Sequence, residues 1–554
     1  MQCTGGQLIA NVLVQQGIDR IFGVPGESFL AVLDALVDTQ QIEFVAAKHE
    51  GAASFMADAD GKLTGRPGLV LVTRGPGASN AYAGVHVAYQ DSTPLIMLVG
   101  LIGRNDEERE AFQEFDLKAI FGTQTKWTAV IDNAERIPEL LTRAFQVAAS
   151  GRPGPVVLGL PEDMLRDVVE TPQLPAKVTP VQAAPSDAQI SEIAKSLSGA
   201  KSPLVIAGGE TWDEQACSDL ADFAAAWHLP VTCSFRSQDR MSALHPNYIG
   251  DAGLGINPAL AKRIRDADVL LVLGARLGDC TTSGYTLLDI PLAKQKILHV
   301  HPDANEIGRV YAPELGVCSG MKQALSALVK HDAPTVSPTW VDWTKAARED
   351  YLKWSTPNPT SHGPVNLAAV IQHLNENLPE DAILTNGAGN YTVWVHRFYQ
   401  HRRFRTQVAP TSGSMGYGLP AAIAASLRHP DRLSICFAGD GCFQMTLQEL
   451  STAQQFGARV IVILVNNGMY GTIRMHQEKN YPGRVSGTDI VNPDFVKLAE
   501  AYGVETARVE KTDQFAEAFD ALAATGKSGV IEVITDPEDL TPRFSLSELR
   551  ASAK

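Results

Sequence analysis

The turn Gly439-Asp440-Gly441, set between two apolar runs, is the feature that most constrains how this chain can fold. Ser434 to Ala438 is a short apolar run that predicts a strand ending at the turn. Met445 to Phe456 carries apolar residues at helical spacing. Val460 to Val465 is unbroken and largely β-branched, which is typical of a strand buried on both faces of a parallel sheet. The stretch therefore predicts a strand, a glycine turn, a helix and a second strand.

Polar residues follow both of these predicted strands. Asp440 follows the first, and Asn467 follows the second 27 positions later (467 − 440). Open α/β sheets bind ligands at the carboxyl edge of their strands. Mg²⁺ prefers carboxylate and amide oxygens and commonly shares them with phosphate, while glycine turns let backbone N–H groups approach a phosphate. A metal-held diphosphate is one interpretation, and an ordinary turn with a capping aspartate is the other.

Strands followed by glycine turns recur along the whole chain. The first third has such a turn at Gly23 to Gly26, and the middle third has several more. The pattern predicts an α/β protein with three doubly wound parallel-sheet domains of roughly 150 residues each. We expect them at residues 1–168, 188–332 and 360–540. Regions rich in proline and lacking periodicity predict linkers across 170–189, and across 333–343 and 355–366.

Composition excludes several classes of function. The net charge of −15 over 554 residues argues against a nucleic-acid surface. No apolar run approaches the roughly 20 residues of a membrane span, and no basic signal-peptide region is evident at the start. The seven cysteines lack metal-ligand or disulfide spacing, which suits a reducing compartment. We therefore expect a cytoplasmic protein with neither nucleic-acid nor membrane partners.

The stretch from Gly439 to Asn467 resembles the signature of thiamine diphosphate enzymes, a Gly-Asp-Gly followed by Asn-Asn after a fixed interval. Over nearly the whole length, the chain resembles the acetolactate synthase group of 2-oxo-acid decarboxylases and carboligases. The resemblance implies thiamine diphosphate and Mg²⁺ as cofactors and a pyruvate-like 2-oxo acid as substrate. It implies decarboxylation followed by ligation of the enamine to a second carbonyl. Decarboxylation alone, flavin-linked oxidation, and a non-enzymatic assembly or regulatory role are the alternatives.

Glu50 lies in the stretch KHEGAAS, which follows GVPGE and precedes TRGPGASNA. A glutamate that opens a helix is often only a favourable charge at the helix amino end. The resemblance instead implies that Glu50 is the catalytic acid, whose carboxyl group favours the imino tautomer of the cofactor's aminopyrimidine. Ala52, Ala53 and Phe55 are expected to desolvate Glu50 and favour its protonated form.

The resemblance also assigns the remaining cofactor contacts. Met415, in GSMGYGLPAA, is either core filler or the apolar wedge that bends the cofactor. Asn390 and Tyr391 replace the Gln and His usual at the terminal phosphate, and both can still donate hydrogen bonds. The implied metal ligands are Asp440, Asn467 and Met469. The full cofactor-binding set is Pro25, Gly26, Glu50, Asn80, Gly389, Asn390, Tyr391, Ser414, Met415, Gly439, Asp440, Gly441, Cys442, Asn467, Met469, Tyr470 and Gly471.

A further set of residues is implied to line the substrate pocket. Lys126 could attract the carboxylate of a 2-oxo acid, or could be an ordinary surface charge. His476 stands where biosynthetic acetolactate synthases carry a tryptophan that favours a larger acceptor, and it is either a pocket residue or a surface residue. The predicted substrate residues are Phe112, Gln113, Lys126, Thr472, Ile473 and His476.

Assembly and flavin binding complete the expectations. Glu50 and Asp440 lie in different domains, and in this family the cofactor sits between such domains of two subunits. The resemblance thus implies a homodimer at least, and commonly a homotetramer. GARLGDCTTSG and HVHPDANEIG in the middle domain resemble stretches that contact FAD. Gly278-Asp279-Cys280 departs from the basic pattern of flavin-containing relatives, so a vestigial domain is favoured over one that binds FAD.

Overall fold

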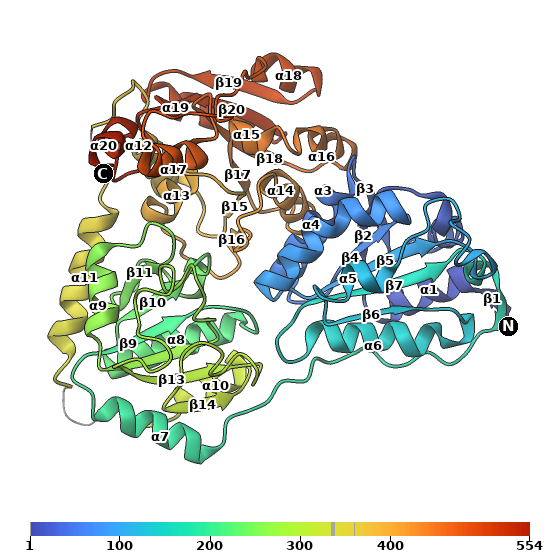
Figure 1. The fold of residues 1–554 in the computed structure, drawn as a ribbon, viewed down its shortest axis with the longest axis horizontal. Coiled ribbons are helices and arrows are strands. Elements are labelled where there is room, and N and C mark those ends of the chain that lie inside the picture. Colours follow the sequence, from blue (N-terminus) through green and yellow to red (C-terminus); the bar gives the residue numbers. More distant parts are fainter. Residues whose placement is uncertain (1, 334–337, 359, 554) are drawn as a thin grey trace.

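A computed structural model describes residues 2–333, 338–358 and 360–553 of the chain. Its described part contains three six-stranded sheets, and every pair of neighbouring strands within each of them is parallel. Helices cover the sheets (Figure 1). The prediction of an α/β fold with three doubly wound sheets is therefore confirmed, whereas the domain boundaries remain predictions.

The N-terminal sheet has the strand order β3-β2-β4-β5-β7-β6. A short antiparallel ladder of β1 (Gln2–Thr4) with β8 (Val168–Glu170) ties the two ends of this region together. The other elements are β2 (Arg20–Gly23), β3 (Glu43–Ala46), β4 (Gly68–Val72), β5 (Leu95–Leu101), β6 (Trp127–Val130) and β7 (Pro155–Pro161), with α1 (Gly5–Gln15), η1 (Glu27–Phe29), α2 (Leu30–Asp38), α3 (Glu50–Thr64), α4 (Gly75–Asp91), η2 (Arg104–Asp106), α5 (Leu117–Phe121), η3 (Ala134–Arg136), α6 (Ile137–Ala149) and η4 (Met164–Arg166).

The middle sheet has the strand order β11-β10-β9-β12-β13-β14, which is the 3-2-1-4-5-6 order of dinucleotide-binding folds. Its strands are β9 (Pro203–Ala207), β10 (Val231–Ser234), β11 (Tyr248–Ala252), β12 (Val269–Leu273), β13 (Lys296–His301) and β14 (Leu315–Cys318). Its helices are α7 (Asp187–Ser198), α8 (Glu214–Trp227), η5 (Gln238–Arg240), α9 (Pro258–Asp266), α10 (Met321–Leu328) and α11 (Val341–Ser355).

The C-terminal sheet has the order β16-β15-β17-β18-β20-β19, which repeats the arrangement of the N-terminal sheet. Its strands are β15 (Ile383–Asn386), β16 (Gln407–Val408), β17 (Ser434–Gly439), β18 (Val460–Asn466), β19 (Glu505–Val509) and β20 (Gly529–Ile534). Its helices are α12 (Leu367–Asn377), α13 (Tyr391–Phe398), α14 (Gly418–Arg428), α15 (Asp440–Phe443), η6 (Leu447–Glu449), α16 (Leu450–Phe456), α17 (Gly471–Asn480), α18 (Phe495–Ala501), α19 (Gln514–Thr525) and α20 (Leu546–Ser552).

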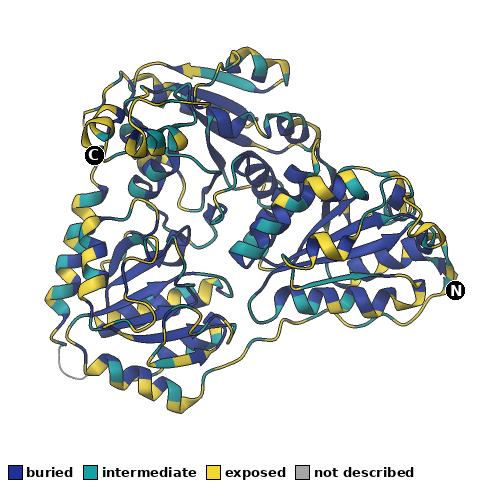
Figure 2. Ribbon diagram, in the orientation of Figure 1, coloured by how far each residue is buried: buried dark blue, intermediate teal, exposed yellow. Residues whose placement is uncertain are grey.

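One continuous hydrophobic core joins the N-terminal and C-terminal sheets. Helices α3 and α14 pack against each other, and the rings of Phe55 and Tyr417 meet with centroids 5.3 Å apart. Figure 2 shows the central strands of all three sheets buried and many of the exposed residues on the outer helices, whereas the edge strand β19 is only partly buried. Full burial of an aliphatic or aromatic side chain stabilises a fold by roughly 1.5–3 kcal/mol. The packing of α3 on α14 therefore fixes how the two outer domains sit together.

Two local predictions were wrong. The helix expected from Met445 to Phe456 begins only at Leu450, after the 3₁₀ turn η6, and Met445 is 48% exposed rather than apolar core. The second linker, expected across 333–343 and 355–366, is interrupted by helix α11, whose Tyr351 packs into the middle core. Residues 334–337 and 359 of that predicted linker lie outside the described residues.

Within the part of the chain that the structure describes, none of the helices combines the length and apolarity needed to cross a bilayer.

Candidate functional site

The C-terminal sheet has its topological switch point between β15 and β17. The chain leaves β15 toward β16 on one side and continues to β17 on the other. A crevice opens where strand order reverses in this way, at the carboxyl ends of the strands. Gly387 to Asn390 follow β15, Asp440 follows β17, and Asn467 follows β18. The predicted cofactor residues of this domain therefore meet at one edge of one sheet.

Asp440 is buried, with 3% of its surface exposed. Its Oδ1 accepts a hydrogen bond from the backbone N–H of Gly441 at 2.9 Å. Its Oδ2 accepts bonds from the backbone N–H of Gly468 at 2.9 Å and from Asn492 Nδ2 at 2.8 Å. Burial raises the pKa of Asp440, and these three hydrogen bonds oppose that rise. A bound cation would act in the same direction as the hydrogen bonds, by favouring the ionised form.

A cavity of about 230 Å³ lies beside Asp440. Fourteen of the predicted cofactor and substrate residues line it: Gly389, Asn390, Tyr391, Met415, Gly439, Asp440, Gly441, Cys442, Asn467, Met469, Tyr470, Gly471, Thr472 and Ile473. The wall is completed by residues that sequence analysis did not single out, among them Val365, Leu367, Thr535 and Leu540. One loop cluster thus brings the glycines, the amide and the carboxylate to a single hollow.

Two glycines of this cavity, Gly439 and Gly441, are crowded by aromatic rings. A Cβ at Gly441 would lie 2.6 Å from the Tyr470 ring, and one at Gly439 would lie 3.1 Å from the Tyr391 ring. The aromatic rings therefore pack directly on the backbone of the turn. Glycine at these positions lets the backbone N–H groups and the rings share a space that larger residues would fill.

The donors at the cavity fit a magnesium diphosphate. No group of three or more His, Cys, Asp or Glu that could hold a metal is found among the described residues. A cation beside Asp440 would instead take the amide oxygen of Asn467, a backbone oxygen and phosphate oxygens, which is the hard-oxygen set that Mg²⁺ prefers. In this structure the Asn467 side-chain oxygen accepts a hydrogen bond from the N–H of Met469 at 3.3 Å.

Three residues around the cavity have informative partners. The Tyr391 hydroxyl accepts a hydrogen bond from Gly387 N–H at 3.1 Å and donates to Cys442 Sγ at 3.5 Å, so it supports the turn from within. Asn390 Oδ1 accepts a hydrogen bond from the Thr472 hydroxyl at 2.9 Å, which joins the loop after β15 to helix α17. Met415 is partly buried against the core and lines the cavity, which agrees with either of its two predicted roles.

Glu50 is the first residue of α3, as predicted, and His49 caps that helix. Glu50 Oε2 accepts a hydrogen bond from Asn80 Nδ2 at 2.9 Å, and Asn80 comes from α4. Glu50 is half-buried and does not line the Asp440 cavity of its own chain. Pro25 and Gly26 follow β2, at the same edge of the N-terminal sheet as Glu50. The N-terminal residues thus form a cluster separate from that cavity. The expected desolvating neighbours, Ala52, Ala53 and Phe55, are buried in the α3 core.

The predicted substrate residues fall into two groups. Thr472 and Ile473 line the cavity from α17, whereas His476, one turn further along the same helix, is exposed and does not line it. Gln113 packs against the turn at Gly75, and its neighbour Phe112 is 73% exposed. These two residues therefore lie at the carboxyl edge of the N-terminal sheet.

Lys126 is not brought to this edge of the N-terminal sheet. It immediately precedes β6, so it lies at the amino edge of a parallel sheet, opposite Glu50. Its Nζ donates a hydrogen bond to the carbonyl of Ser150 at 2.7 Å. Ser414 is likewise close to the cavity in sequence but absent from its lining; its hydroxyl lies 3.3 Å from that of Ser412.

Asn492 is the main site residue that sequence analysis missed. Its amide bonds both Asp440 Oδ2 and Asn466 Oδ1, at 2.8 and 2.9 Å. It lies in an irregular segment before α18, where no periodicity or glycine turn marks it. A side chain that orients a candidate metal ligand from outside the motif carries no local sequence signal, so only the fold reveals it.

Helix α17 is held against the C-terminal helix by ion pairs of its buried residue Glu478. The guanidinium groups of Arg550, on the C-terminal helix α20, and Arg474 contact its carboxylate at 2.7 and 3.2 Å. The hydrogen bond from Arg550, together with Gly483 N–H and Arg474, lowers the pKa of Glu478 to about 2. The helix that carries Thr472, Ile473 and His476 is thus held by the last helix of the chain.

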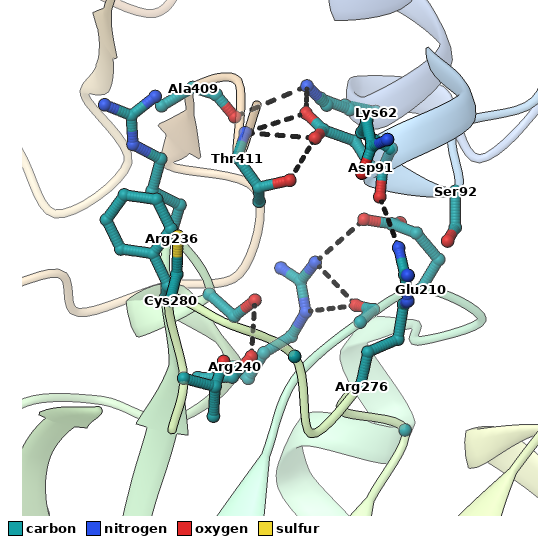
Figure 3. Close-up of a pocket in the computed structure, with 18 of the residues that line it drawn as sticks. Lys62, Asp91, Ser92, Glu210, Arg236, Arg240, Arg276, Cys280, Ala409 and Thr411 are labelled. Carbon is teal, nitrogen blue, oxygen red and sulfur yellow. Dashed lines mark hydrogen bonds and ion pairs between the residues drawn. The ribbon is translucent and has the colours of Figure 1, made fainter. Parts of the chain in front are cut away.

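A second cavity, of about 240 Å³, lies at the switch point of the middle sheet, between β9 and β12 (Figure 3). Arg240 is held by Asp239 at 2.6 Å and Glu210 at 3.3 Å, and burial raises the pKa of Glu210 to about 7. The Nε atoms of Arg236 and Arg405 are buried without a hydrogen-bond partner, so a phosphate group would find donors here.

The volume of this middle cavity limits what it holds without rearrangement. Small-molecule sites commonly measure roughly 300–1,000 Å³, and FAD is larger than most ligands of that class. The charged donors fit the phosphate part of a nucleotide, whereas the free volume of about 240 Å³ is small for a whole flavin dinucleotide. The prediction of a vestigial site, favoured over one that binds FAD, therefore stays a prediction.

The comparisons with known proteins agree with this architecture. Residues 3–120 match the family described as thiamine pyrophosphate enzyme, N-terminal TPP binding domain; residues 190–328 match its central domain and residues 387–533 its C-terminal TPP binding domain. The fold and the Asp440 cavity thus define a thiamine pyrophosphate (thiamine diphosphate) enzyme. The chain belongs to this family, and within it to the acetolactate synthase-like group.

Individual relatives support that assignment along the whole chain. The acetolactate synthase large subunit of Lactococcus lactis is 32% identical over 97% of this chain and 94% of its own length. The acetolactate synthase isozyme 3 large subunit of Escherichia coli is 32% identical over 90% of this chain and 88% of its own. The mitochondrial acetolactate synthase of Schizosaccharomyces pombe is 31% identical over 96% and 83%.

The first prediction concerns the candidate metal ligand. Asp440→Ala should abolish binding of thiamine diphosphate rather than only slow turnover, because the diphosphate charge would lose the carboxylate that anchors its cation. Isothermal titration of the protein with thiamine diphosphate and Mg²⁺ measures this directly. Asp431→Ala, which removes an exposed carboxylate just before β17, at the opposite end of that strand from Asp440, is the matched control and should leave the affinity unchanged. Unaltered affinity in Asp440→Ala would refute the assignment.

Proposed function

We propose that the protein is a thiamine diphosphate- and Mg²⁺-dependent carboligase of the acetolactate synthase type. It decarboxylates a pyruvate-like 2-oxo acid and joins the remaining fragment to a second carbonyl compound. The observation that carries this proposal is the Asp440 cavity at a switch point, in a chain similar to acetolactate synthases over almost its entire length. Non-ligating decarboxylation and flavin-linked oxidation are the competing outcomes.

When bound, thiamine diphosphate supplies a nucleophilic carbon at which a 2-oxo acid can lose CO₂ and accept a new carbonyl partner. The residues of the Asp440 cavity bind and orient that group. Asp440 and Asn467 would hold the cation, and the backbone N–H groups beside Gly441, at the amino end of α15, would be available to the phosphates. Met415 would supply apolar contact to the bound group.

Glu50 handles the proton. Its carboxyl group is oriented by Asn80, which donates to Oε2 at 2.9 Å and leaves Oε1 free for a ring nitrogen. A carboxyl group hydrogen-bonded there favours the tautomer that accepts the proton from the reacting carbon. The apolar lining of the Asp440 cavity, including Val365, Leu367 and Leu540, excludes water and so protects the reacting carbon from premature protonation.

Product analysis tests the proposed reaction. Incubation with pyruvate, thiamine diphosphate and Mg²⁺ should yield a C–C ligation product, which separates this activity from release of acetaldehyde or formation of acetate. The absorbance spectrum of the purified protein, recorded in parallel, should lack flavin bands. Acetaldehyde as the only product would establish a simple decarboxylase, and acetate with bound flavin would establish an oxidase.

We further propose that the protein works as a homodimer at least, and as a homotetramer in the arrangement common to its family, in the cytoplasm. Glu50 does not line its own chain's Asp440 cavity; Asn80, which bonds Glu50, is exposed, and so is Phe112 at the same edge of the sheet. A second copy that covers this edge would complete the site. The seven cysteines are all free, which suits a reducing compartment.

A mixing experiment tests the shared site. Glu50→Gln and Asp440→Ala chains should each be inactive alone, whereas a hybrid dimer carries one site with both native groups. Random exchange of equal amounts should restore about a quarter of the native sites, since half of the dimers are hybrids with one good site each. Product formation after subunit exchange, verified by mass spectrometry of differently tagged chains, is the measurement. No recovery would argue against a site formed by two subunits.

Acceptor choice tests the role of helix α17. His476 is smaller and more polar than the tryptophan of biosynthetic relatives, so the native protein should show little preference for 2-oxobutanoate over pyruvate as acceptor. A single methylene in a pocket is worth only about 1–3 kcal/mol, or roughly 10–200-fold in discrimination. His476→Trp should raise that preference. The product ratio from a mixture of both acceptors is the measurement.

The control for this substitution is Lys497→Trp, which places the same indole on the exposed surface of α18. It should leave the product ratio unchanged. A strong 2-oxobutanoate preference in the native protein, or an unaltered ratio in His476→Trp, would place His476 outside the acceptor pocket.

A further inference from the structure

We propose that Glu449, in the C-terminal domain, is a positioning residue for Glu50. The inference rests on the proposed function, because it takes Glu50 as the acid that activates the cofactor. Glu449 ends the 3₁₀ turn η6 and has none of its surface exposed. It belongs to the segment that follows Gly439-Asp440-Gly441, yet its carboxyl group reaches the N-terminal domain just before Glu50.

Both carboxylate oxygens of Glu449 accept a hydrogen bond from the same backbone N–H group. Glu449 Oε1 and Oε2 accept from the backbone N–H of Lys48 at 3.1 and 3.2 Å. The Thr452 hydroxyl donates to Glu449 Oε2 at 2.6 Å and orients the carboxyl group from within the C-terminal domain. Both partners of this link are therefore fixed: a buried side chain on one side and main chain on the other.

The held segment leads directly to the acid. Lys48 is followed by His49, whose Nδ1 caps α3 by accepting from Gly51 N–H at 3.0 Å, and then by Glu50 as the first helical residue. Only two peptide units separate the bonded N–H group from Glu50. Because helix ends fray unless their first N–H groups are anchored, release of Lys48 would loosen the residue that carries the carboxyl group.

A buried carboxyl group is a costly choice for a merely structural contact. Burial raises the pKa of Glu449, and the donors from Thr452 and from Lys48 oppose that rise. The hydrogen-bond donors to the Glu449 carboxyl group thus come from the loop before Glu50 and from the first turn of α16. The Lys48 side chain adds a separate contact, from its Nζ to Gln455 Oε1 of α16 at 2.7 Å.

The ten-residue segment from Asp440 to Glu449 also contacts the loop that carries Met415. The Thr446 hydroxyl donates to the carbonyl of Gly416 at 2.7 Å, directly after Met415. Asp440 at its start holds the candidate cation, Thr446 fixes the Met415 loop, and Glu449 at its end fixes the Glu50 loop. If Glu50 serves the partner's cofactor, this segment couples the geometry of one site to the acid of the next.

The experiment measures hydrogen–deuterium exchange at C2 of bound thiamine diphosphate, by NMR after acid quench, in the full-length holoenzyme. Glu449→Ala should slow exchange about 100-fold, the size of effect that a misplacement of about 1 Å produces, with affinity for thiamine diphosphate unchanged. Glu449→Gln retains an acceptor oxygen for Lys48 N–H and should restore most of the rate. Gln455→Ala, which removes the neighbouring Lys48 side-chain contact, is the matched control and should exchange at the native rate.

A double substitution separates the outcomes. If Glu449 acts through Glu50, then Glu50→Gln/Glu449→Ala should exchange no more slowly than Glu50→Gln alone. Multiplied effects, native exchange in folded Glu449→Ala, or a Glu449→Gln rate as low as that of the alanine variant would each overturn the proposal. Undiminished exchange in Glu50→Gln would instead refute the proposed acid itself, whatever the Glu449 variants show.

Discussion

The carboxylate of Asp440, buried at the end of β17, is the constraint on which the candidate site depends. Among the described residues no lysine or arginine forms an ion pair with it, so its charge is met by two backbone N–H groups and the amide of Asn492. A cation beside this buried carboxyl group would favour its ionised form, in the same direction as the three neutral donors. The turn, the glycines that admit Tyr391 and Tyr470, and the strand ends around it all serve to keep that group in place.

The contact between the N-terminal and C-terminal domains also depends on buried charged groups. Lys62 on α3 is paired with Asp58 at 2.8 Å and with Asp91 of α4 at 2.5 Å. Tyr417, which precedes α14, donates to Asp58 at 2.6 Å, so the network crosses from the N-terminal to the C-terminal domain. A buried network of this kind is costly to break once one partner is removed. It locks α3, whose first residue is Glu50, against the domain that holds Asp440.

Much of the architecture could be predicted from local pattern. Val460 to Val465 is buried along its length because only a central parallel strand suits an unbroken apolar run, and Glu50 opens a helix because a short strand and a capping residue precede it. Features set by tertiary contact could not be predicted. Met445 resembles a helical core position but is exposed, and Lys126 precedes its strand, so it lies at the edge of the N-terminal sheet opposite Glu50. Helix α11 was not predicted because it has few apolar residues. Tyr351 is recognised as a core residue only from its packing in the middle domain.

Asn492 and Glu449 show a different limit. Asn492 lies outside the signature stretch, and Glu449 lies within it but is not one of the residues that define it. Both bond a group whose own position the sequence does reveal: Asp440 in one case, the loop before Glu50 in the other. Helix α17 is another case in which a distant residue positions the cavity wall. Thr472 and Ile473 line the cavity from this helix, and its buried Glu478 forms an ion pair with Arg550 of the last helix. The residues that touch a ligand can be recognised by type, while those that hold them in place are distributed through the fold. The geometry of this side of the cavity therefore depends on a C-terminal helix that itself contributes no residue to the cavity lining.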